Sequence, residues 1–68
     1  MTDQLRIEPT SRPALYFVEA DDGRHIGWIE RLSLRRCRAT DRNGRVVGSA
    51  LTLYRAASLL SDEREAGR

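Results

Sequence analysis

The sequence predicts an α+β domain: a three- to four-stranded antiparallel sheet, built from two consecutive hairpins, packed by one C-terminal helix. The first observation is a near-repeat, with the letters DGRHIG at residues 22–27 and NGRVVG at residues 43–48. In each copy a turn signal leads into a short apolar segment that ends in glycine, which is typical of a β-hairpin. The second observation is a stretch with helical periodicity, Thr52 to Glu65, directly after the second copy.

Residues 1–13 are expected to form a flexible N-terminal arm, and residues 14–66 a single ββββα domain. The arm is polar, contains Pro9 and Pro13, and shows no sustained hydrophobic period. Pro13 therefore marks the predicted start of the domain.

The first hairpin is predicted from the aromatic and branched run at residues 15–20. The turn follows at residues 21–23, and the return strand runs from His25 to about Leu32. Alternation along this strand places Ile26, Trp28 and Leu32 on one face, so we expect Trp28 to anchor the core.

The second hairpin is predicted from residues 35–41 and 45–50, joined by a turn at residues 42–44. In its first strand Cys37 and Ala39 share one face, while Arg36, Arg38 and Thr40 share the other. This alternation indicates a half-buried strand with a basic exposed face.

The helix is predicted to begin at Thr52, whose hydroxyl can accept a hydrogen bond from a backbone amide of the first turn. Four apolar residues then recur at helical spacing and form the stripe that faces the sheet: Leu53, Ala56, Ala57 and Leu60. Residues 66–68 are expected to be a frayed end.

The length and composition indicate a small domain without a catalytic centre. The chain has 68 residues, and a domain of this size buries only about 60% of the surface that its unfolded chain exposes. A homodimer is therefore one of the expected states, because a second copy would cover more surface. His25 lies near Asp21 and Asp22, but it is the single histidine, and Cys37 is the single cysteine. We predict no enzyme activity, no metal site and no cofactor, because no residue cluster has the required spacing.

Arginine is the strongest functional signal. All 12 basic residues are arginine, the formal net charge is +2, and six arginines lie in residues 31–45. Such a cluster can bind phosphates or an acidic protein surface, and the alternative is a solvated face of a sheet. The candidate nucleic-acid-binding residues are Arg35, Arg36, Arg38, Arg42 and Arg45.

Residues 36–57 are similar to the sheet-plus-helix DNA-binding domains of phage integrase arms and plant ethylene-response factors. The resemblance rests on five residues: Gly48, Ser49, Thr52, Ala56 and Ala57. It implies that the sheet lies in the DNA major groove, with Arg36, Arg38 and Arg45 nearest the contacting positions. The same stretch also resembles the YegP-like family of small repeat proteins, whose biochemical role is poorly defined.

These observations favour a small non-catalytic nucleic-acid-binding accessory protein, encoded by a phage or other mobile element. DNA, more than RNA, is the nucleic acid that we expect it to bind. The alternative is a protein-protein interaction module, such as a phage-encoded inhibitor that docks on a larger protein or dimerises through a sheet edge. We expect a cytoplasmic location and no membrane partner, because residues 1–13 lack the pattern of a signal peptide and no apolar run could span a bilayer.

Overall fold

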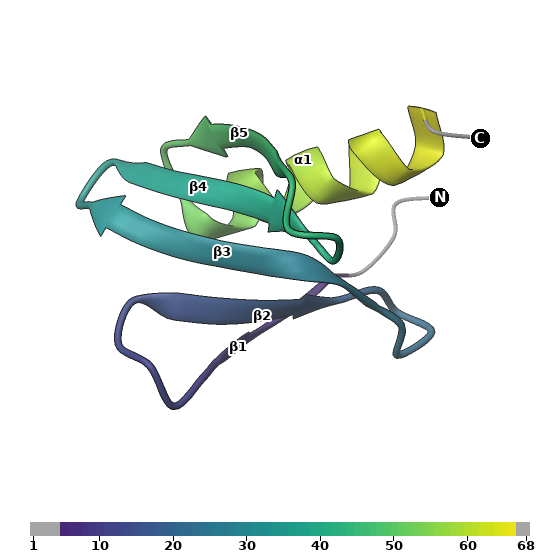
Figure 1. The fold of residues 1–68 in the computed structure, drawn as a ribbon, viewed down its shortest axis with the longest axis horizontal. Helices are drawn as coiled ribbons and strands as arrows, with labels where there is room; N and C mark the ends of the chain where they lie inside the picture. Colours follow the sequence, from purple (N-terminus) through teal and green to yellow (C-terminus); the bar gives the residue numbers. More distant parts are fainter. Residues whose placement is uncertain (1–4, 67–68) are drawn as a thin grey trace.

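The computed structural model describes residues 5–66, and the side chains of residues 5–62. The chain forms five strands and then one helix: β1 (Arg6–Pro9), β2 (Leu15–Glu19), β3 (His25–Ser33), β4 (Arg36–Asp41), β5 (Val46–Ala50) and α1 (Leu53–Ala66). Each strand pairs antiparallel with the next, so the order in the sheet is β1-β2-β3-β4-β5. Helix α1 lies across one face of β3, β4 and β5 (Figure 1). The α+β class is confirmed.

The sheet has five strands because part of the predicted arm belongs to it. Residues 6–9 pair with β2, with Ile7 opposite Val18 and Pro9 opposite Tyr16. Ile7 and the preceding Leu5 are partly buried against the core. The prediction of a free arm through residue 13 is therefore wrong for residues 6–9, whereas residues 1–4 lie outside the described part of the chain. A strand this short gives too little alternation to be recognised from sequence.

The near-repeat corresponds to two turns of the same construction. In the first, the Gly23 amide donates to the Ala20 carbonyl at 3.0 Å and the Ala20 amide donates to the Arg24 carbonyl at 2.8 Å. In the second, the Gly44 amide donates to the Asp41 carbonyl at 3.0 Å and the Asp41 amide donates to the Arg45 carbonyl at 2.8 Å. Both turn glycines have positive φ, 84° and 88°, which explains why glycine occupies these positions.

Trp28 does not anchor the core, which corrects the sequence-based expectation. Between β2 and β3 the register shifts: Val18 pairs with Gly27, but Glu19 pairs with His25, so Ile26 is the extra residue of a β-bulge. The bulge reverses the alternation, and Ile29 rather than Trp28 points toward the helix, where its exposure is 0%. Trp28 is half-buried on the opposite face of the sheet, which we call the open face.

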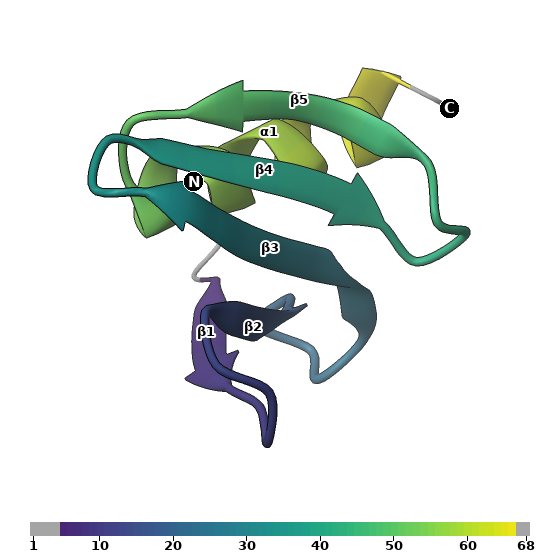
Figure 2. The same ribbon diagram turned by 60° about the vertical axis from the view of Figure 1, so that its left-hand side comes forward.

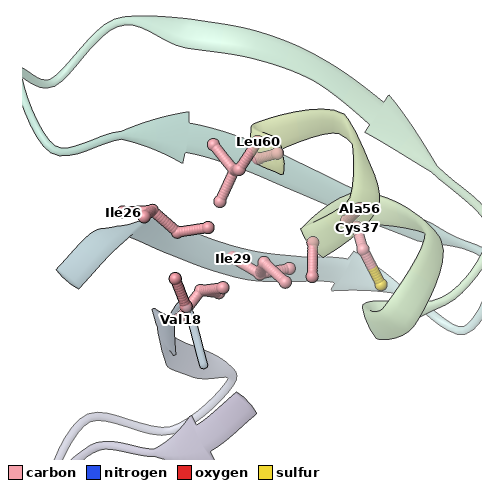
Figure 3. Close-up of a cluster of buried hydrophobic side chains, with 9 residues drawn as sticks. Val18, Ile26, Ile29, Cys37, Ala56 and Leu60 are labelled. Carbon is pink, nitrogen blue, oxygen red and sulfur yellow. The ribbon is translucent and has the colours of Figure 1, made fainter. Parts of the chain in front are cut away.

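The core lies between α1 and the sheet. Its buried residues include Val18, Ile29 and Cys37, the largest of the fully buried side chains (Figure 3). The predicted facing of β4 is confirmed, because Cys37 and Ala39 are both fully buried whereas Arg36 is exposed. Two small residues of the helix, Ala56 and Ala57, are also fully buried and allow α1 to approach the sheet closely.

The predicted helix cap is confirmed. The Thr52 hydroxyl accepts a hydrogen bond from the Arg55 amide at 3.1 Å, and its carbonyl accepts one from the Ala56 amide. The apolar stripe faces the sheet as expected, with Leu60 buried at its far end. Of the residues expected to fray, Gly67 and Arg68 lie outside the described part of the chain.

Candidate nucleic-acid interface

The meander places the five candidate arginines in three separate regions. Arg35 and Arg36 lie at the β3–β4 turn, Arg38 lies within β4, and Arg42 and Arg45 lie in the β4–β5 turn. At about 3.3 Å per residue, the length of β4 separates its two turns by roughly 20 Å. The five arginines therefore do not form one patch.

Arg38 is paired within the protein. Its guanidinium donates a hydrogen bond to the Glu30 carboxylate on the neighbouring strand, and both side chains are a little more than 40% exposed. Its Nε atom is buried and has no partner among the described residues. Because the carboxylate offsets its charge, Arg38 contributes less to an attraction for phosphate than a free arginine would.

The open face as a whole is not basic, contrary to the expectation for β4. The strand register places three arginines and three glutamates on this face: Arg6, Arg36, Arg38, Glu8, Glu19 and Glu30. Its centre is aromatic. The His25 ring stacks on Phe17 at 4.1 Å and meets Trp28 edge-on at 4.6 Å. Both ring nitrogens of His25 are buried without a partner among the described residues, so this cluster is internally packed.

A basic surface forms instead at one end of the sheet. Alternate connections of a meander lie at the same end, so the β3–β4 turn and the β5–α1 connection lie side by side, while the twist of the sheet sets the β1–β2 loop apart from them (Figure 2). The Arg31 amide donates to the Ala14 carbonyl at 2.8 Å and joins two of these segments. We call residues 10–14, 31–36 and 51–55 the basic end. They include no aspartate or glutamate, and five exposed arginines: Arg12, Arg31, Arg35, Arg36 and Arg55.

Among the side chains of residues 5–62, four of the five large apolar ones that are exposed also lie at the basic end. Leu34, at the tip of the β3–β4 turn, is 90% exposed. Leu32, Leu51 and Tyr54 are 46%, 57% and 57% exposed. The basic end thus combines cationic and apolar side chains, as interaction surfaces often do.

The opposite end of the sheet has mixed charge. It consists of the β2–β3 and β4–β5 turns, which contain Asp21, Asp22 and Asp41 together with Arg24, Arg42 and Arg45. A hollow of about 180 Å³ opens there, bordered by Arg24, Arg42, His25 and Leu60. The Asp41 carboxylate accepts hydrogen bonds from the Asn43 and Arg45 amides, both at 2.9 Å, so it acts mainly in the turn.

Sequence reasoning found two arginines of the basic end and missed three. The sequence pattern places Arg12 in the arm and Arg55 in the helix, and Arg31 is not among the five candidate residues. These positions are far apart in sequence and share one end of the sheet only because of the meander. The alternation of turns between the two ends of a hairpin sheet is the signal that could have grouped them.

Within residues 5–62, no three His, Cys, Asp or Glu side chains come together in a way that could hold a metal ion. Cys37 is a free thiol and is fully buried. The one helix of the described region, α1, is neither long nor apolar enough to cross a membrane.

Comparison of the chain with protein-family models, with curated proteins and with solved structures gives no match.

Proposed function

We propose that this protein is a small non-catalytic accessory protein that binds duplex DNA through its basic end. The observation that carries the proposal is the separation of charge along the molecule: five exposed arginines and no carboxylate at the basic end, against mixed charge at the opposite end. Arginine binds phosphate with several directed donors, and such contacts supply most of the affinity of small DNA-binding domains.

Helix α1 supports the same orientation. Its N-terminus, at Leu53, lies at the basic end, and the amides of a first helical turn carry a partial positive charge. The Thr52 hydroxyl occupies one of these amides, that of Arg55. The helix adds to the electrostatic attraction but is not a phosphate site by itself.

The β3–β4 turn is the part of the basic end best placed to approach DNA, since Leu34 at its tip is 90% exposed. β3 and β4 are flanked by β2 and β5, so the turn rather than a free two-stranded ribbon would face the major groove. In this turn Leu34 and Arg35 form the tip, and Arg31 and Arg36 flank it. We infer that the tip of the turn enters the groove while Arg12 and Arg55 contact the neighbouring backbone.

The proposal is tested by comparing two double variants that remove the same charge. Arg35→Gln with Arg36→Gln removes two charges from the basic end, whereas Arg42→Gln with Arg45→Gln removes two from the opposite end. We expect the first variant to bind DNA more weakly and with less dependence on salt. The magnitude of the slope of log K against log salt should fall by about 2, since each phosphate contact adds about 1 to that magnitude. The second variant should bind nearly as the parent protein does.

Fluorescence anisotropy with a labelled duplex, at low and moderate salt, measures both quantities. Circular dichroism confirms that each variant is folded, which we expect because all four arginines are exposed. Equal losses in the two variants would show that binding follows net charge rather than the basic end. Failure of the parent protein to bind at low salt would refute the proposal.

A second candidate function, docking on an acidic protein surface, is favoured by the exposed apolar residues of the basic end. Leu34 is 90% exposed and shares this end with three other exposed apolar side chains, and an exposed apolar patch is typical of a protein-binding surface. An acidic groove with an apolar floor would accommodate both Leu34 and the flanking Arg35 and Arg36.

Leu34→Ser distinguishes the two candidates. It removes an apolar side chain without changing charge, so under the DNA proposal we expect an unchanged salt slope and nearly unchanged affinity for the duplex. Under the docking candidate the parent protein does not bind DNA, and the variant loses its affinity for the partner. Anisotropy at low salt on the parent and the variant separates these outcomes, with Arg35→Gln plus Arg36→Gln as the charge control.

A further inference from the structure

The two edges of the sheet differ in how they are protected. Edge strands commonly carry charges or proline, which discourage pairing with another chain. β1 follows this pattern: it contains Pro9, and Arg6 lies 3.9 Å from Glu8 in an ion pair. β5 is protected less: a bulge at Val47, where Ala39 pairs with Gly48 and Thr40 with Val46, is its one such device, and its sequence VVGSA contains neither a charge nor proline. Within the described residues β5 has a strand partner, β4, on one side only.

The residues around the β5 edge are complementary to a second copy of themselves. Val46 begins the strand and Leu51 follows its end, and they are 54% and 57% exposed. With the two-fold axis at Ser49, an antiparallel pair brings the start of one β5 beside the end of the other, so Val46 and Val47 of each copy lie beside Leu51 and Thr52 of its partner. The contact therefore covers the exposed Val46 and Leu51 side chains of both copies.

The centre of β5 allows the close approach that strand pairing needs. It consists of the small residues Gly48, Ser49 and Ala50. Arg45 precedes the strand, but the antiparallel arrangement places it beside Thr52 and Leu53 of the partner, which are uncharged. No like charges therefore face each other along the paired strands.

We propose that two copies of this chain associate through antiparallel pairing of their β5 strands, which joins two five-stranded sheets into one sheet of ten strands. The contact covers Leu51 but leaves the other two segments of the basic end exposed, because the β1–β2 loop and the β3–β4 turn are not part of it. It also adds buried area to a small domain with a thin core. This inference is independent of DNA binding.

Sedimentation equilibrium over a wide range of protein concentration tests the proposal. We expect the parent protein to dimerise. Ser49→Glu should raise the dimer dissociation constant about tenfold or more, since the two glutamates meet near the two-fold axis. Ser49 is exposed and lies opposite Arg38, so the folded monomer should tolerate the carboxylate. The matched control is Ser11→Glu, the same substitution at an exposed position in the β1–β2 loop.

Disulfide trapping provides a second measurement that does not depend on weakening the dimer. Ser49→Cys should form a covalent dimer under mild oxidation, because cysteines opposite each other in paired strands lie within bridging distance. Cys37 is fully buried and should not react, and Ser11→Cys measures random cross-linking. A parent protein that is monomeric at every concentration would overturn the proposal and leave the β5 edge open to a strand from a different protein. Dimerisation that Ser49→Glu leaves intact, with no trapping at Ser49→Cys, would overturn it as well.

Discussion

Among the Gly→Ala substitutions at the glycines of the described residues, Gly27→Ala is expected to destabilise the protein most. Gly27 lies in β3 beneath the helix, and a Cβ atom there would overlap the backbone carbonyl oxygen of Thr40. It would also lie 2.9 and 3.1 Å from the two terminal methyl groups of Leu60. The leucine can rotate, but the carbonyl belongs to the β4 backbone and cannot yield without opening the sheet. We expect the free energy of unfolding to fall by about 3 kcal/mol or more.

Urea denaturation followed by circular dichroism measures this loss, and Gly48→Ala is the matched control. A Cβ at Gly48 would lie 3.3 Å from one methyl group of Leu59, which needs only a slight adjustment of a side chain. The control should therefore change stability far less, even though both glycines lie within strands and face α1. If the two variants had the same midpoint, the close approach of β3, β4 and α1 at Gly27 would be contradicted.

Ile29→Ala should produce the second large effect. Ile29 is the largest fully buried side chain and lies at the centre of the sheet, opposite Tyr16 and Ala39 on the two neighbouring strands. Removing three carbon atoms from a closely packed site costs their transfer free energy together with the cavity that remains. We expect the free energy of unfolding to fall by about 2–5 kcal/mol, which is a large part of the stability of a domain of this size.

Leu34→Ala is the control for this variant, since it shortens a side chain that is 90% exposed. Its unfolding midpoint should stay close to that of the parent protein. Thermal and urea denaturation should rank the two variants in the same order. A small effect at Ile29 would mean that the core is centred elsewhere, for example on the Phe17, His25 and Trp28 cluster of the open face.

Most of the fold could be predicted from the sequence because its signals are local. The turns that contain Gly23 and Gly44 define the two hairpins, and Thr52 defines the start of the helix. Two features were missed because they depend on tertiary structure. β1 exists only through its pairing with β2, and the bulge at Ile26 reverses the facing of Trp28 by a register shift that alternation alone does not reveal.

The candidate interface was less predictable than the fold. Six arginines within residues 31–45 form a cluster in sequence, but β4 carries Arg36 and Arg42 to opposite ends of the sheet. Glu30 pairs with Arg38, and the sequence gives no sign of that contact at a separation of eight residues. The basic end draws on three segments, so it becomes visible only once the order of the strands is known.

The meander topology also affects how the chain folds. Every strand pairs with the strand next to it in sequence, and the connections between them are short, so each hairpin closes with a small loss of chain entropy. Proteins dominated by such local contacts fold faster than those whose sheets join distant segments. The exceptions are the contacts of α1 with β1, β3 and β4, and the one that spans most of the chain is with β1, where Leu5 and Ile7 reach the core that the helix covers. Closing that contact spans almost the whole described chain, so we expect β1 to be the last strand to settle and the first to detach.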